Sequence, residues 1–234
     1  MAKLREVISI ITTILSNGPV SDDFQFSDQM IYFILKDLRA KTLYQKINSG
    51  KWINPQNYQI IPCLKLNLDT LVDCECYTAD CKGLQSICEI PRIIASDKGL
   101  YVEGIWTISS PTPERLDNIT LDQLRLSKYS KTMKNVKGWF IHKSKLYITG
   151  YDRLKAVKIS ALFEDPIEVL NMSQSCACNE DDSPICIDPY DADFPIDAAF
   201  MKDLRTMTYE ELVKIAMMMP KDNENDANIP QQKS

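Results

Sequence analysis

Glycine and histidine are scarce in this chain. Its 234 residues include 7 glycines and one histidine. Neither G-x-G-x-x-G nor a Walker loop occurs in the sequence, which argues against an enzyme that binds phosphates through a Gly-rich loop. A single histidine excludes a conventional histidine-rich catalytic metal site, and no G-x-S-x-G marks a hydrolase serine. No known class of catalytic site is therefore supported.

Long hydrophobic runs are also missing, so a membrane span is not expected. The first residues, MAKLREVISIITTILSNG, superficially resemble a signal peptide but show no small-residue cleavage pattern. Their apolar residues fall on one helical face instead. These residues are Leu4, Val7, Ile8, Ile11, Ile14 and Leu15. We expect a core helix here and, without an export signal, a reducing compartment for the eight cysteines.

Charge is unevenly distributed along the chain. Residues 125–158 contain ten Lys or Arg and one acid, whereas residues 164–197 contain ten acids and no Lys or Arg. Adjacent blocks of opposite charge suggest a surface with two differently charged sides. The simpler alternative is that both blocks are solvated faces or loops.

The first 54 residues have the pattern of a helical hairpin. Gly18-Pro19 should end the first helix, because glycine accepts a left-handed terminal conformation and proline cannot continue a helix. Ser27 is a suitable N-cap for a second helix, and the apolar stripe of this helix continues to about Ile47.

Alternation of apolar and polar residues begins after Asn54-Pro55 and indicates strands. It is clearest at Leu64, Leu66 and Leu68. Further strands are expected at residues 92–95, 100–108, 138–142, 146–149 and 155–163, and WFIHKSKLYITG should form a hairpin. Residues 109–135 interrupt this pattern and are expected to be an insertion or long loop with one helical turn near 121–126.

Residues that start and end helices occur again in the last third of the chain, after an irregular acidic stretch at residues 171–194. A helix is expected to open near Pro195, and Thr208-x-x-Glu211 matches a capping box for a helix that Pro220 ends. The polar segment 221–234 is expected to extend away from the core.

These elements predict an α+β fold. The N-terminal hairpin (1–54) and C-terminal helices should form one helical core, with an antiparallel β domain (55–170) inserted between them. Residues 171–220 would supply the acidic loop and the C-terminal helices, followed by the polar tail 221–234.

Cysteines cluster in the stretch DCECYTADC. Four thiolates, from Cys74, Cys76, Cys81 and Cys88, could bind a structural zinc ion tetrahedrally. However, structural zinc sites usually present C-x-x-C pairs, and here the first pair is C-x-C, so the match is weak and loop or core thiols are the alternative. Nothing in the sequence orients His142 toward a cysteine nucleophile, and a hairpin histidine is the simpler interpretation.

Four lysines recur every three residues near Tyr129 and Trp139. They are Lys128, Lys131, Lys134 and Lys137. Clustered positive charge suffices for non-specific contact with phosphates, but the aromatic residues lack a recognisable nucleic-acid-binding signature. A zinc-clipped nucleic-acid-binding protein is therefore an alternative function.

Three segments carry a resemblance to a known family: SDDFQFSDQMIYFILKDLRAKTLYQKI, LYITG with LKAVKISALFEDP, and FPIDAAFMKDLRTMTYEELVKIAMMMPKDNENDA. Together they resemble the head-to-tail connector, or ring, proteins of short-tailed bacteriophages, in particular crAss-like phages. The resemblance implies a non-enzymatic virion protein without a cofactor. It implies a dodecameric ring below the portal protein, which extends the channel for packaged DNA and docks other ring or tail proteins.

Under this resemblance, the two charge blocks could meet between neighbouring subunits of the ring. A cyclic ring needs contacts between two different surfaces. The candidate interface residues are Lys128, Lys131, Lys134 and Lys137 on the basic side and Glu180, Asp181 and Asp182 on the acidic side. The protein would be made in the cytoplasm of the bacterial host and reside in the portal–tail region of the virion.

Overall fold

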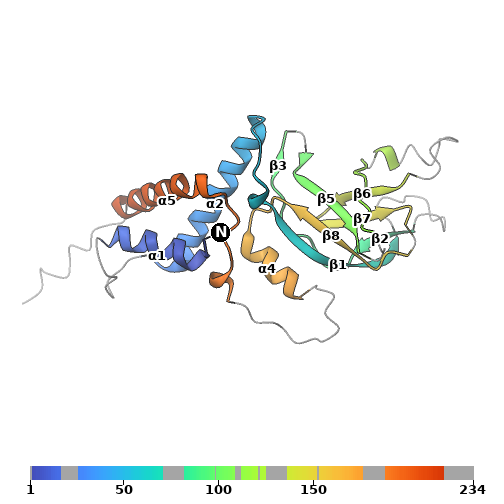
Figure 1. The fold of residues 1–234 in the computed structure, drawn as a ribbon, viewed down its shortest axis with the longest axis horizontal. Coiled ribbons are helices and arrows are strands. Elements are labelled where there is room, and N and C mark those ends of the chain that lie inside the picture. Colours follow the sequence, from blue (N-terminus) through green and yellow to red (C-terminus); the bar gives the residue numbers. More distant parts are fainter. Residues whose placement is uncertain are drawn as a thin grey trace, which may run out of the picture.

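The computed structural model describes residues 2–16, 26–70, 82–97, 99–108, 112–120, 122–124, 136–151, 153–175 and 188–218. It confirms the α+β fold class: helices gather at one end of an elongated molecule and an antiparallel sheet at the other (Figure 1). Among the described helices, none combines the length and hydropathy needed to cross a membrane.

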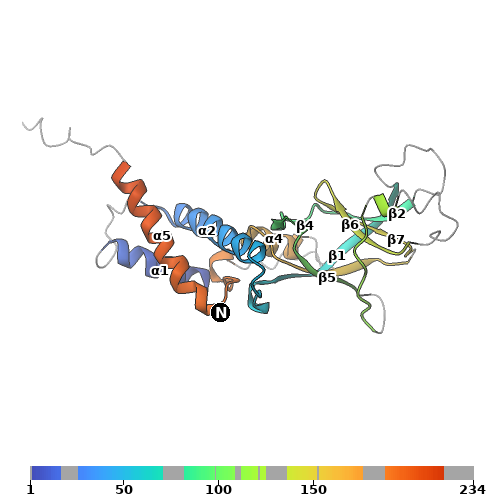
Figure 2. The ribbon, with the colours of Figure 1, turned by 90° about the horizontal axis from the view of Figure 1, so that it is seen from above.

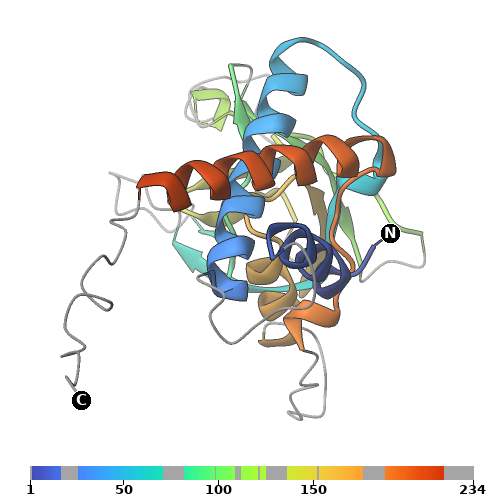
Figure 3. The same ribbon diagram turned by 90° about the vertical axis from the view of Figure 1, so that its left-hand side faces the viewer.

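Three helices form the helical module: α1 (Leu4–Leu15), α2 (Asp28–Asn48) and α5 (Ala198–Met218). They share one apolar cluster that includes Val7, Ile31 and Leu204. As predicted, Ser27 caps α2, since its side chain accepts a hydrogen bond from the Met30 amide at 3.2 Å. Viewed from the helical end, α5 crosses α2 (Figure 3). The first and last helices of the described residues, α1 and α5, are thereby joined in one core.

Two expectations about the helices are wrong. Thr208 does not cap a helix: it is buried in the middle of α5, and its hydroxyl donates to the Leu204 carbonyl at 2.8 Å. The helix begins at Ala198, where the Asp197 carboxylate accepts a hydrogen bond from the Ala199 amide, and it runs without a break to Met218. Ile14, expected in the core, is 49% exposed.

Six strands form the main sheet, in the order β5-β8-β1-β2-β7-β6, with every neighbouring pair antiparallel. Their bounds are β1 (Gln59–Thr70), β2 (Lys82–Ser86), β5 (Val102–Thr107), β6 (Gly138–His142), β7 (Lys145–Thr149) and β8 (Ala156–Ala161). A separate ribbon pairs β3 (Ala95–Ser96) with β4 (Gly99–Leu100). The β6–β7 hairpin is confirmed, and its turn residues Lys143 and Ser144 both have positive φ.

Residues 114–119, here called the strap, connect the two edges of the six-stranded sheet. On one edge, the Thr107 amide of β5 donates to the Glu114 carbonyl and the Leu116 amide donates to the Ile105 carbonyl. On the other edge, the Trp139 amide of β6 donates to the Asp117 carbonyl at 2.8 Å. The strap therefore closes the sheet into a barrel and satisfies backbone groups that an edge strand would leave unpaired.

The prediction of an insertion or long loop at residues 109–135 is incomplete, because part of this segment forms the strap. Residues 114–119 belong to the barrel wall, and Asp122–Leu124 are helical where one helical turn was expected. Residues 109–111, 121 and 125–135 lie outside the described residues.

Glycine is required where the strap crosses β6. A Cβ atom at Gly138 would lie 2.5 Å from the Asp117 carbonyl oxygen and 2.6 Å from the Ile119 side chain. Gly104 on β5 is similarly restricted by the Trp106 ring. Gly138 thus permits the close approach of the strap at the β6 edge, whereas Gly104 leaves room on β5 for the Trp106 ring of the same strand.

The barrel interior is apolar. Buried side chains from the sheet and the strap, among them Ile61, Ile105, Leu116, Trp139 and Ile148, form one cluster. A helix that the sequence analysis did not predict, α4 (Pro166–Ser175), lies beside β1, between the barrel and the helical module (Figure 2). The Asp165 carboxylate accepts hydrogen bonds from the Ile167 and Glu168 amides and so caps α4.

Candidate functional site

A fully buried arginine joins the helical module to the barrel. Arg39 of α2 is 0% exposed and donates to the carbonyl oxygens of Pro195 and Phe163 at 2.8 Å and of Asn57 at 3.3 Å. Burial lowers the pKa of Arg39 to about 10. Because these three carbonyls come from separate segments, Arg39 fixes the orientation of the two parts of the molecule.

A second polar link lies beside Arg39. The Tyr32 hydroxyl donates to Asp165 at 2.6 Å, and the Lys36 ammonium contacts the other oxygen of the same carboxylate at 3.0 Å. Burial and the hydrogen bond to Asp165 raise the pKa of Tyr32 above its ordinary value. Burial alone would raise the pKa of Asp165, but the hydrogen bonds from Tyr32 and Lys36 outweigh it and lower that pKa. The carboxylate therefore stays charged at the junction.

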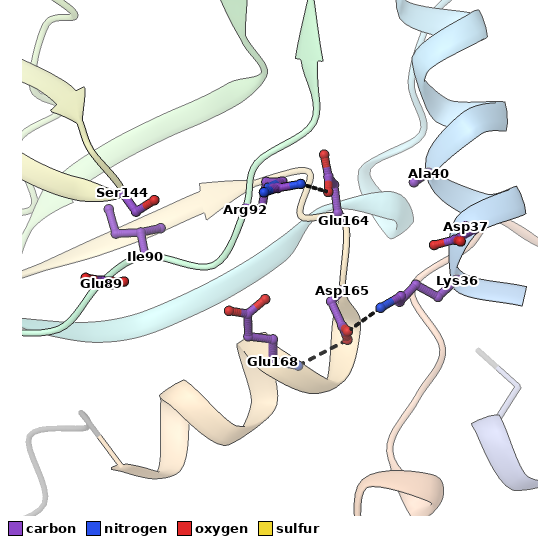
Figure 4. Close-up of a pocket in the computed structure, with 10 residues that line it drawn as sticks. All are labelled: Lys36, Asp37, Ala40, Glu89, Ile90, Arg92, Ser144, Glu164, Asp165 and Glu168. Atoms are coloured by element: carbon purple, nitrogen blue, oxygen red, sulfur yellow. Dashed lines mark hydrogen bonds and ion pairs between the residues drawn. The ribbon is translucent and has the colours of Figure 1, made fainter. Parts of the chain in front are cut away.

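A polar cleft of about 450 Å³ opens over this junction, between α2, the start of α4 and the barrel (Figure 4). Its lining residues are Lys36, Asp37, Ala40, Glu89, Ile90, Arg92, Ser144, Glu164, Asp165 and Glu168. Carboxylates outnumber cations, and Arg92 lies 3.8 Å from Glu164. Burial raises the pKa of Glu164, against the opposing effect of Arg92. The cleft is suited to cationic groups.

A groove of about 470 Å³ with different chemistry lies between α1 and α5. Its lining residues are Ile10, Ile14, Lys202, Arg205, Thr206 and Tyr209. Ile10 and Ile14 are 40% and 49% exposed and lie one helical turn apart. The groove thus combines exposed apolar side chains with two cations, and its lining contains no acid.

Only one of the predicted interface residues belongs to the described part of the chain. Lys137 is exposed next to β6, with its ammonium 5.5 Å from the centre of the Tyr151 ring. The other candidates lie outside the described residues: Lys128, Lys131, Lys134, Glu180, Asp181 and Asp182. Pairing between the charge blocks therefore stays a prediction.

Of the four candidate zinc-ligand cysteines, too, only one belongs to the described residues. Cys88, a zinc-ligand candidate, is disulfide-bonded, as is Cys63 of β1, so the Cys88 sulfur is not a thiolate in this structure. Cys74, Cys76 and Cys81 lie outside the described residues. Within the described ranges, no group of three or more His, Cys, Asp or Glu residues could hold a metal ion. His142 is half-buried at the end of β6, paired with Lys145 across the hairpin.

Comparison with protein families gives a match over nearly the whole chain. The family described as phage tail ring protein 2, of the CrAss ring type, matches residues 6–233. The chain belongs to this family. None of the curated proteins compared with the chain matches it.

Membership in the family of phage tail ring proteins confirms the resemblance to ring proteins of crAss-like phages. A tail ring protein is a structural component that forms a ring with other components of the virion tail. The relevant sites are therefore surfaces for assembly, and the cleft and the groove are two candidates with different chemistry.

Sequence reasoning missed the residues that form the junction and the two surfaces, although some left a signal in the sequence. Arg39 interrupts the apolar stripe of Ile31, Leu35 and Leu43 at helical spacing, which is a sign of a buried arginine. Asp165-Pro166 is the N-cap and first-turn pair of α4. In contrast, the groove forms where α1 packs beside α5, and no local sequence pattern predicts that contact.

Proposed function

We propose that this tail ring protein is a subunit of the head-to-tail connector, in a closed ring of twelve copies below the portal protein. The family match to residues 6–233 carries the proposal. In this position the ring extends the channel through which packaged DNA passes and provides a platform for the next ring or tail protein. The protein would work without catalysis or a cofactor, in the portal–tail region of virions assembled after synthesis in the host cytoplasm.

The two-part architecture supports this role. In a cyclic ring each subunit presents one surface to the neighbour on one side and a different surface to the neighbour on the other. The acidic cleft at the junction and the basic, apolar groove between α1 and α5 are two such different surfaces. Arg39 and Asp165 hold the helical module and barrel together, so both surfaces keep a fixed relation.

The opposite charge blocks supply a further subunit contact in this proposal. The basic side contains Lys128, Lys131, Lys134 and Lys137, and the acidic side contains Glu180, Asp181 and Asp182. Contact between the basic block of one copy and the acidic block of the next would favour the correct orientation of the two copies. Complementary charges select orientation more than they add affinity.

Cross-linking mass spectrometry of intact particles tests the proposed position. A connector ring predicts cross-links from this chain to the portal protein and to a second tail component. Cross-links confined to distal tail proteins would overturn the position below the portal while leaving the chain a tail ring protein.

A further inference from the structure

The groove between α1 and α5 has a composition that calls for a particular kind of occupant. Ile10, Ile14 and Tyr209 offer apolar surface, while Lys202 and Arg205 lie at the same groove. The Arg205 Nε atom is buried, and no described residue accepts a hydrogen bond from it. The two cations, Lys202 and Arg205, favour an occupant that carries carboxylates, because hydrogen bonds between charged groups are the stronger ones.

The segment that follows α5 has matching chemistry. Residues 219–234 include three acids in alternate positions, Asp222, Glu224 and Asp226, and then Ile229-Pro230. The acids complement Lys202 and Arg205, and the apolar pair complements Ile10 and Ile14. Most of this segment also lies within the part of the chain that the family pattern matches.

The length of the segment allows it to reach another copy. Sixteen residues follow Met218 in the sequence, and at about 3.3 Å per extended residue they span up to roughly 50 Å. The distance back along α5 from Met218 to Thr206 is only about 18 Å, at 1.5 Å per residue. Reach alone therefore allows either the chain's own groove or that of a neighbour.

We infer that the α1/α5 groove binds residues 222–230 of a second copy of this chain. This inference rests on the proposed ring, in which a donating segment and a receiving groove on each copy form a heterologous contact that repeats until the ring closes. The acids pair with Lys202 and Arg205, and Ile229-Pro230 covers Ile10 and Ile14. A segment bound in this way can wrap the surface of a neighbour and so tie two copies together.

Isotope-mixed cross-linking of the full-length chain tests the inference. Equal amounts of ¹⁴N and ¹⁵N protein are mixed as dilute monomers, concentrated, and treated with a carbodiimide that joins lysine amines to carboxylates. Exchange between copies predicts Lys202 joined to Asp222, Glu224 or Asp226, with about half of these products carrying one light and one heavy peptide. The Lys36–Asp165 ion pair, at 3.0 Å within one chain, is the internal control and should give no mixed product.

A charge reversal separates specific pairing from random contact. Arg205→Glu should lower the yield of mixed Lys202 products about tenfold. Adding Asp222→Lys and Glu224→Lys to the Arg205→Glu chain should restore at least part of the ring assembly. Lys51→Glu, an exposed reversal outside both the groove and the basic block, should leave the yield unchanged.

The outcomes distinguish this inference from the proposed function. Lys202 products found only within one isotope would mean that each segment occupies its own groove, and absence of these products in an assembled ring would mean that another partner fills it. Either result overturns the inference alone. Native mass spectrometry of the same sample measures ring formation independently, and a concentrated sample without rings would count against the proposed function.

Discussion

Arg39 Nη1 donates a hydrogen bond to the Phe163 carbonyl oxygen at 2.8 Å, across the boundary between the helical module and the barrel. The same guanidinium also reaches Pro195 and Asn57. No carboxylate takes part in these three bonds. One cation thus orders three backbone segments that meet only in the folded chain.

Replacing Arg39 should be among the most destabilising changes at the junction. Arg39→Met keeps much of the apolar stem but leaves three buried carbonyls without their donor, which should cost about 2–5 kcal/mol of unfolding free energy. Urea unfolding followed by circular dichroism measures it. Arg92→Met is the matched control, since the Arg92 side chain is 82% exposed and should change stability by less than about 1 kcal/mol. Equal effects of the two changes would contradict the role given to Arg39.

Gly138→Ala tests the closure of the barrel by the strap. The added Cβ would approach the Asp117 carbonyl at 2.5 Å, so the strap must move or its hydrogen bond to Trp139 must lengthen. We expect a loss of about 1–3 kcal/mol, typical of overpacking at a rigid contact, and faster hydrogen exchange at the Trp139 amide. Asn118→Ala, an exposed change in the strap itself, is the control. Unchanged exchange at Trp139 would show that the strap does not close the barrel tightly.

The Asp165 link predicts a pH-dependent stability. Because the folded-state pKa of Asp165 is lowered, its contribution is complete above the ordinary carboxyl pKa and is lost as pH falls through the lower folded value. Asp165→Asn keeps an N-cap residue but removes the charge that faces Lys36. The variant should be less stable than wild type at pH 7, and the difference should shrink toward pH 3. A difference that grows on acidification would reverse the assigned sign; Asp97→Asn, an exposed change, serves as the control.

Charge reversal in the basic block tests the proposed pairing between subunits. Lys131→Glu with Lys134→Glu should impair ring assembly, because like charges would then face the acidic block. Size-exclusion chromatography with light scattering reports the assembly. Lys41→Glu with Lys51→Glu, at two exposed lysines outside the basic block, is a control of the same charge change. Unchanged assembly of the double variant would remove the charge-block pairing from the account.

Local chemistry made much of the fold predictable. The Ser27 cap, the β6–β7 hairpin and the α+β class follow from residues adjacent in sequence, and all three are confirmed. Thr208 shows the limit of such reasoning: it matches a capping box, but the contacts of α5 with α2 and α1 keep the helix continuous through it. Burial of the surrounding face decides the outcome there.

The candidate sites depended on long-range packing, which is why so little of them was anticipated. The strap is a largely polar sequence that follows two prolines, Pro111 and Pro113, and only its pairing with two distant strands gives it a role in the barrel. Likewise, Arg205 looks like any surface residue of a helix until α1 packs beside it. The sequence shows the residue types, but the residues whose contacts determine their roles lie far away along the chain.

The copy number of this chain in purified particles tests the central claim most directly. Quantitative mass spectrometry with labelled reference peptides compares it with the portal protein of the same phage. A connector ring predicts near-equal abundance, about twelve copies of each in a closed cyclic assembly. Absence of the chain from the particle, or a copy number unrelated to that of the portal, would contradict the proposal that it forms the ring below the portal.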